Sequence, residues 1–349
     1  LGLPVRYNIL STSLYGSIKT GSQGVSAVLT SVMVLLGISM VVIDMIFVRE
    51  FRRFITIGGK GGSRTPVDLG NMRYPASALV IGIFLLTAVV PLLTLFISTI
   101  SQVPGVFTPE NFTLDFWIGK DIPVNPGQAG LLLNPGILRA AGNSLKIAGI
   151  AALVAGFLGT FVGSIVARFQ NTALAQYLRQ VSFLPYLVPS MGFGAAYLSL
   201  FAVPRGPIPS LYGTLLLVMI VMSVKYLPFA SRAGISAMMQ LGTEPEEAGM
   251  VVGAPWHKRM ARIVIPIQKT ALVTGVLLPF ISGMKELSLV VMLATPGTEL
   301  LTTQVLRYMD YNYIQLANAT NLFIIFIVPS LTYLVQKFTG SSLARGLEG

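Results

Sequence analysis

A polar run lies between two long apolar stretches of the chain; it reads EEAGMVVGAPWHKRMARIVIP and ends at Pro266. Two glutamates open the run, and His257, Lys258, Arg259 and Arg262 follow. Acidic, imidazole and basic side chains at close spacing are the groups that enzymes use for proton transfer. However, His257 is the only histidine in 349 residues, and the chain has no cysteine. Most schemes of nucleophilic catalysis therefore lack their base and most metal sites lack their ligands, so we expect no catalytic residue and no metal site.

The spacing of this run predicts a helix–turn–helix elbow. Thr243 followed by Glu246 is a capping-box pattern, with Pro245 in the first helical turn, where the missing N–H costs nothing. The short helix is expected to run to about Val252. The Gly-Ala-Pro triplet that follows ends it. A second helical stretch is predicted from Trp256 to Ile263, and Pro266 closes it before the next apolar stretch. One end of the elbow is acidic and the other basic, with apolar side chains available as contacts.

The elements that must position the elbow are membrane spans. The chain is 53% hydrophobic and only 11% charged, which is more apolar than a soluble domain requires. A run of about 20 apolar residues crosses the hydrocarbon layer as a helix. The sequence contains seven runs of this kind, at 25–48, 76–100, 145–167, 181–202, 211–229, 271–293 and 314–335. The predicted fold class is therefore all-α, a polytopic membrane protein with about seven transmembrane helices.

Lysine and arginine gather in alternate loops, and this bias predicts the orientation of the chain. The loop 49–73 carries six of them and the segment 230–270 carries five, so both are expected in the cytoplasm. The tail 341–349 is expected there too, and the loop 101–144 outside. The net charge of +11 follows from this orientation rather than from binding to nucleic acid. We expect a multi-pass protein of the cell inner membrane with a cytoplasmic C-terminus.

Charged residues also fall within the apolar runs. Lys285 and Glu286 lie inside the sixth run, where charge is costly and is by default a functional candidate. Neighbours on a helix point in different directions, so these two are not expected to pair with each other. Each is a candidate for the translocation path or for a structural partner at a repeat interface. Asp44 and Lys225 lie nearer the inner ends of their runs and are expected to extend their charges to the membrane surface.

Two segments of the chain resemble each other, and we call this internal similarity the echo. LGLPVRYNILSTSLY at the start resembles LATPGTELLTTQVLRY from Leu293, with Thr12 matching Thr303 and Tyr15 matching Tyr308 if small gaps are allowed. Each copy precedes an apolar run. We therefore expect residues 1–48 to be the last external loop and final span of a preceding half. A basic Gly-rich linker then covers 49–74, a six-span module 75–340, and a tail 341–349.

The elbow resembles the E-A-A-x3-G-x9-I-x-L-P pattern of type I ABC importer permeases. Two positions depart from that pattern, because Gly249 replaces the second alanine and Ile265 replaces the leucine. In that family the elbow is a coupling helix that docks into a groove of the ATP-hydrolysing subunit. The resemblance assigns ATPase coupling to Glu247, Ala248, Gly249, Gly253, Ile263 and Pro266.

The resemblance extends over the six-span module. The stretch Lys285-Glu286-Leu287-Ser288 and the turn 294–298 are similar to the branch that imports ferric iron, while related branches import thiamine, polyamines or phosphonates. The resemblance implies a permease subunit rather than an enzyme, with no cofactor of its own because ATP binds to a partner. The implied partners are an ABC ATPase subunit, an extracytoplasmic substrate-binding protein, and a second permease half, fused or homodimeric, in the lipid bilayer.

Two other classes of protein compete with this interpretation. An intramembrane protease needs a nucleophile and its base within the membrane, and His257 lies in the elbow instead. A secondary transporter driven by an ion gradient commonly uses repeats and intramembrane charges, and Lys285 and Glu286 would suit it. The Gly-rich run ITIGGKGGSRT lacks the spacing of a P-loop, so no nucleotide site is expected in this chain. The elbow pattern favours the ABC permease and leaves the secondary transporter as the alternative.

Overall fold

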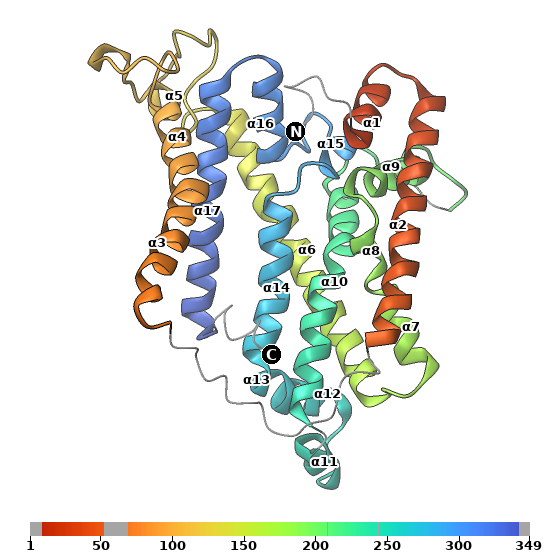
Figure 1. The fold of residues 1–349 in the computed structure, drawn as a ribbon. Helices are drawn as coiled ribbons and strands as arrows, with labels where there is room; N and C mark the ends of the chain where they lie inside the picture. Colours follow the sequence, from red (N-terminus) through yellow and green to blue (C-terminus); the bar gives the residue numbers. More distant parts are fainter. Residues whose placement is uncertain (1–8, 52–68, 208, 243, 342–349) are drawn as a thin grey trace. The chain divides into compact units, whose positions relative to one another are not determined.

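The computed structural model describes residues 9–51, 69–207, 209–242 and 244–341, which form helices joined by turns (Figure 1). Within these ranges the only β-pairing is two isolated bridges. The predicted all-α fold class is therefore confirmed for this part of the chain. The Gly-rich run of the linker and the first eight residues of the echo lie outside the described ranges.

The helices have the following bounds, with the π turns named η2 and η4 and the 3₁₀ turns η1 and η3: α1 Leu10–Lys19, α2 Gln23–Phe51, η1 Gly70–Met72, α3 Arg73–Phe84, η2 Leu85–Val89, α4 Val90–Thr99, η3 Pro109–Asn111, α5 Asp115–Ile118, α6 Pro135–Arg168, α7 Ala173–Val181, α8 Leu184–Leu187, α9 Ser190–Phe201, α10 Leu215–Leu241, α11 Glu244–Val251, α12 Trp256–Arg259, η4 Met260–Val264, α13 Ile265–Ile267, α14 Lys269–Met284, α15 Val290–Leu293, α16 Leu301–Asp310 and α17 Ile314–Thr339.

Each predicted apolar run overlaps one or more of these helices. Four continuous stretches are long and apolar enough to cross a membrane, namely Gly70–Thr99, Pro135–Arg168, Leu215–Leu241 and Ile314–Thr339. Two bent pairs of helices are long and apolar enough when each pair is taken together, and α2 contains a shorter apolar segment, Gly24–Met40. α10 continues to Leu241, well past the predicted end of its run at Phe229. It therefore leads directly into the elbow.

The run 181–202 is not one straight span. Its helices, Ala173–Leu187 and Ser190–Phe201, meet at 102°. Val188 between them is extended, with ψ at 126°, because it precedes Pro189. The proline ring clashes with a helical conformation of the residue before it. We call residues 188–189 the first break.

The prediction of a continuous helix over 271–293 is wrong. α14 ends at Met284, and residues 285–289 are non-helical before α15 begins. Glu286 stabilises this second break because its carboxylate accepts a hydrogen bond from the N–H of Leu289 at 3.0 Å. Leu289 is the N-cap residue of α15, so the bond satisfies an N–H that has no partner within the helix. A carboxylate that the sequence places within a helix therefore caps a new helix.

Two prolines follow π turns by the same spacing. Pro266 comes two residues after η4, and Pro91 comes two residues after η2. A proline ring clashes with the carbonyl four residues before it, and a π turn at that point shifts the carbonyl out of the regular helical register. The second arm of the elbow therefore continues through Pro266 to Ile267, and the prediction that Pro266 closes it is wrong. The arm bends at Gln268, at 84° to α14.

The described residues fall into two compact units, each with its own packing. The first draws on residues 1–41, 139–304 and 324–349, and the second on 42–138 and 305–323. In the first unit, Gly159 and Gly163 of α6 face the backbone of Ala230 and Gly234 on α10 so closely that no side chain would fit. In the second unit, the Gln315 side chain donates to the carbonyl of Gln102 at 2.7 Å. These units do not follow the predicted boundaries at 48, 74 and 340, which stay predictions.

The echo in the sequence corresponds to two similar helical hairpins. One offset of 291 residues relates the starts of α1 and α16, Leu10 and Leu301, and the starts of α2 and α17, Gln23 and Ile314. The same offset relates the two positive-φ turn residues, Gly21 at 72° and Asn312 at 62°.

The capping of the two hairpins is also the same. The N–H of Ile9 donates to the hydroxyl of Thr12 at 2.9 Å, and the N–H of Leu300 donates to the hydroxyl of Thr303 at 2.9 Å. The ungapped register places Tyr15 opposite Leu306 rather than opposite Tyr308, because a gap cannot fall inside a helix that both copies share.

Candidate functional site

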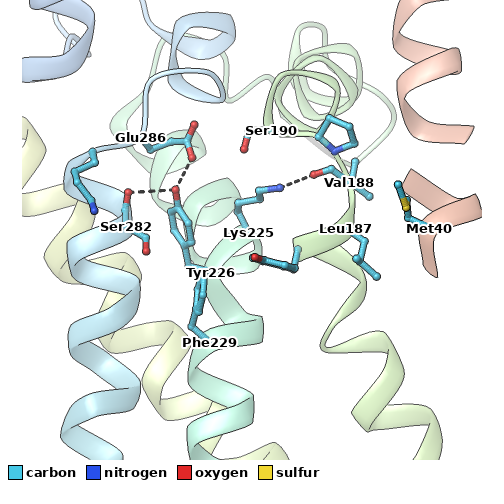
Figure 2. A pocket seen from close by; sticks show the side chains of 12 residues that line it. Met40, Leu187, Val188, Ser190, Lys225, Tyr226, Phe229, Ser282 and Glu286 are labelled. Atoms are coloured by element: carbon cyan, nitrogen blue, oxygen red, sulfur yellow. Dashed lines mark hydrogen bonds between the residues drawn. The ribbon is translucent and has the colours of Figure 1, made fainter. Parts of the chain in front are cut away.

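A cavity of about 620 Å³ lies in the first unit, where both breaks meet α10 (Figure 2). Its volume falls within the range of small-molecule sites. The lining residues come from α2, the first break with its flanking helices, α10, and the end of α14 with the second break. They are Met40, Tyr186, Leu187, Val188, Pro189, Ser190, Lys225, Tyr226, Phe229, Ser282, Lys285 and Glu286.

Lys225 holds the first break. Its side chain is only 6% exposed, and its ammonium donates to the carbonyls of Pro185 at 2.9 Å and Val188 at 2.5 Å. Helix ends leave carbonyls without intrahelical partners, and a buried ammonium needs acceptors, so each satisfies the other. The ammonium also lies 5.4 Å from the centre of the Phe193 ring. The prediction that Lys225 extends to the membrane surface is therefore wrong, and the side chain of Asp44 lies outside the described residues.

Tyr226, the next residue on α10, holds the second break. Its hydroxyl hydrogen-bonds to the carboxylate of Glu286 and lies 3.2 Å from the carbonyl of Ser282 at the end of α14 (Figure 2). The other carboxylate oxygen of Glu286 accepts from Leu289, and the hydroxyl of Thr302 donates to the Glu286 carbonyl at 2.7 Å. Glu286 is therefore fixed through both its side chain and its backbone.

The charges around the cavity come from three of its lining residues. Lys225 and Lys285 each contribute an ammonium, and Glu286 contributes one carboxylate that already accepts two hydrogen bonds. Lys285 is exposed on the cavity wall and Glu286 is half-buried, so the structure brings both predicted path candidates to one cavity. Among the described residues no three His, Asp or Glu side chains gather as metal ligands would.

The elbow is the second candidate site, and its first arm is tied to α6 by an ion pair. Arg168, the last residue of α6, forms two hydrogen bonds with Glu246, and the Arg259 Nε lies 3.7 Å from the same carboxylate. Arg259 also donates to the carbonyl of Ala254 at 2.6 Å, which closes the turn. The sequence pattern gives Glu246 only a capping role and misses this ion pair, because Arg168 is far away in the chain.

The predicted coupling residues differ in exposure. Glu247 and Ala248 are exposed on α11, whereas Gly249 is buried against the second arm. A Cβ at Gly249 would lie 3.0 Å from side-chain atoms of Ile263 and Arg259, so a larger residue there would require these side chains to shift. Gly253 has no neighbour within 4 Å but has φ at 75°, so its role is the left-handed turn. Ile263 is half-buried and Pro266 is exposed.

The turn of the elbow presents apolar side chains to its surroundings. Val251 is 87% exposed and Val252 is 79% exposed, with Met250 at 50% beside them. Exposed apolar groups of this kind, rimmed by charged residues, mark interaction surfaces. Helices that break beside a cavity, with an elbow that joins α10 to α14, are typical of helical membrane transport proteins.

The family described as binding-protein-dependent transport system inner membrane component matches residues 159–347, more than half of the chain. The chain belongs to this family. Its fold is that of the type I ABC importer permeases, as the sequence resemblance predicts.

Individual relatives are permeases named for different substrates. The ferric transport system permease protein of Actinobacillus pleuropneumoniae is 23% identical over 314 residues, which are 87% of this chain and 42% of the relative. The sulfate transport system permease protein of Escherichia coli is 27% identical over 195 residues, 52% of this chain and 70% of the relative. The chain thus spans less than half the length of its ferric relative.

Among solved structures, a bacterial ABC transporter involved in the import of the acidic polysaccharide alginate has a similar fold. The TM-score is 0.57 at 13% sequence identity, and the match covers 77% of this chain and 94% of that one. At this identity the likeness concerns the fold alone.

Proposed function

We propose that the chain is a transmembrane permease subunit of an ATP-driven ABC importer. In this proposal a binding protein delivers the substrate from outside. A separate ATPase subunit docks on the elbow, and this subunit binds and hydrolyses ATP. The chain itself holds no cofactor and catalyses no reaction. The observation that carries the proposal is the elbow, with its exposed Val251 and Val252 on a turn braced by Gly249, Gly253 and the Arg168–Glu246 pair.

Reconstitution separates this proposal from the secondary-transporter alternative. Proteoliposomes that contain the permease, its ATPase and the loaded binding protein should take up substrate only when ATP is supplied. Uptake that follows an imposed ion gradient without the ATPase would establish the alternative instead.

We propose the cavity as part of the translocation path. Glu286 and Lys285 then line the path, as the sequence predicts, and Lys225 and Tyr226 fix its walls. The support is that two broken spans meet at this cavity, because non-helical backbone at membrane depth is tolerated where it is buried in protein or lines a water-filled space.

For the substrate we propose ferric iron first, because the ferric relative matches 87% of the chain whereas the sulfate relative matches 52%. An oxyanion of the sulfate or phosphonate kind is a second candidate. The support is the sulfate relative, together with Lys285, which lines the cavity beside a Glu286 carboxylate that already accepts two hydrogen bonds. Thiamine and polyamines are weaker alternatives from the same class of permease.

The purified partner binding protein distinguishes these substrates directly. Tight binding of Fe³⁺ with no retention of sulfate or 2-aminoethylphosphonate would support ferric iron, and the opposite result would support the oxyanion.

We further propose that residues 1–48 end a preceding permease half and that 49–74 is a cytoplasmic linker to the module at 75–340. The matching hairpins α1–α2 and α16–α17 support this proposal, since a repeated half should end in the same hairpin. The second half is then fused or supplied by another copy. The Lys and Arg bias of the loops supports a cytoplasmic elbow and tail, 341–349, in a multi-pass protein of the inner membrane.

A further inference from the structure

Two long helices leave the elbow at its opposite ends and both lead to the cavity. α10 ends at Leu241, and α11 begins at Glu244. The second arm of the elbow ends at Ile267, and α14 begins at Lys269. α10 and α14 run side by side from the elbow to the second break (Figure 1).

α10 and α14 pack so closely that they should move as one body. A Cβ at Gly275 of α14 would lie 3.1 Å from the Cβ of Ala233, and one at Gly283 would lie 2.9 Å from the sulfur of Met222. Close approach at glycine gives extensive van der Waals contact between membrane helices. Tyr226 adds its hydrogen bond to Glu286 at the cavity end. A displacement of the elbow therefore reaches the cavity through both helices together.

The first break is held by this pair of helices on one side and by α2 on the other. Lys225 binds the carbonyls of Pro185 and Val188 from the side of α10. On the side of α2, a Cβ at Gly37 would lie 3.1 Å from the Leu187 carbonyl and 3.3 Å from Pro189. The first break thus lies between the buried ammonium of Lys225 and α2, which packs closely against its other side.

We propose that Lys225 is a positioning residue that transmits movement of the elbow to the first break and so opens or closes the cavity wall at residues 187–190. A tethered ammonium suits this role because it bonds two carbonyls of the break and moves with α10. The proposal rests on the proposed coupling function of the elbow. It assigns Lys225 to the moving wall and not to the substrate.

The experiment uses thiol labelling at the break in the complete transporter. The chain has no cysteine, so Ser190→Cys introduces a single thiol at a cavity-lining position. In the otherwise unchanged chain we expect the labelling rate of this thiol to differ between the ATP-bound and nucleotide-free complexes. With Lys225→Met added, the difference should disappear and uptake should fall about tenfold or more, as the loss of charge-assisted hydrogen bonds implies. ATPase binding and basal hydrolysis should be unchanged.

Two variants make the result specific. Lys225→Arg keeps a charged donor and should restore the nucleotide-dependent labelling at least in part. Lys146→Met removes an exposed lysine of α6 and should change neither labelling nor uptake. If Lys225→Met reduces the amount of inserted protein, Lys225→Gln provides the same comparison, because it keeps a polar group but is too short to bond both carbonyls.

The outcomes separate this proposal from the proposed function. Nucleotide-dependent labelling that persists in Lys225→Met with normal uptake would overturn the role of Lys225. Labelling that changes normally while the apparent affinity for substrate falls would also overturn it, since Lys225 would then bind substrate. Failure of the coupling function would show instead as an ATPase subunit that does not co-purify with the unchanged permease.

Discussion

At the scale of single residues, Lys225 and Tyr226 show how neighbours on one helix can stabilise two different breaks. Lys225 bonds the carbonyls of Pro185 and Val188, and Tyr226 bonds the Ser282 carbonyl at the end of α14 and the Glu286 carboxylate. The sequence predicts that Lys285 and Glu286 do not pair with each other, and the structure places Glu286 on Tyr226 and Leu289. It does not reveal the role of Lys225, because a lysine near the end of an apolar run usually extends to the surface.

Replacement of Glu286 tests this residue-scale account. A carboxylate accepts from both Tyr226 and Leu289, whereas Glu286→Gln offers one carbonyl oxygen and directs its NH₂ at the other donor. We expect uptake to fall about tenfold with expression and ATPase binding unchanged, as the loss of one hydrogen bond to a charged group implies. The measurement is initial uptake at matched protein levels, with exposed Glu110→Gln as the control. Full activity of Glu286→Leu would contradict the account.

At the scale of elements, the hydropathy pattern finds the spans but not their breaks. Pro189 is a signal that the pattern contains, since the residue before a proline avoids the helical conformation. The second break carries no proline, and only the contacts of Glu286 reveal why α14 stops. Likewise the spacing finds both arms of the elbow but not its brace, because Glu246 pairs with Arg168 from a different helix. Contacts between distant elements are what the sequence pattern lacks.

The turn of the elbow depends on Gly253. Its φ of 75° costs a residue with a side chain roughly 1–2 kcal/mol, and a large side chain there would also stand beside the exposed Val251 and Val252. We expect Gly253→Trp to separate ATP hydrolysis from uptake while the protein still inserts. Gly253→Asn should be milder because asparagine tolerates this conformation. The ratio of substrate transported to ATP hydrolysed measures the effect, and a normal ratio in Gly253→Trp would show that the coupling assignment is wrong.

The brace of the elbow is testable by exchange of its charges. Arg168→Glu alone places two carboxylates together and should weaken binding of the ATPase subunit. The double variant Arg168→Glu with Glu246→Arg restores opposite charges and should recover part of that binding. Co-purification of the ATPase provides the measurement. A double variant that binds no better than the single one would refute a role for this pair in shaping the elbow.

At the scale of the whole molecule, the internal repeat and the elbow carry the account. The sequence echo suggested the repeat, and the constant offset of 291 residues between the two hairpins gives it a structural basis. The elbow links this architecture to energy supplied by a partner, because its apolar turn has no contact of its own that would cover Val251 and Val252 within the described chain. If the elbow docks on an ATPase, that turn must become buried in the complex.

The most direct measurement of this central claim is the accessibility of residue 251. Val251→Cys would be the only thiol in the chain and stands on the most exposed side chain of the elbow turn. In inside-out vesicles we predict rapid labelling by a water-soluble maleimide, strong protection when the ATPase subunit is added, and cross-linking to that subunit through a short bifunctional reagent. Equal labelling with and without the ATPase, together with uptake driven by an ion gradient alone, would contradict the account.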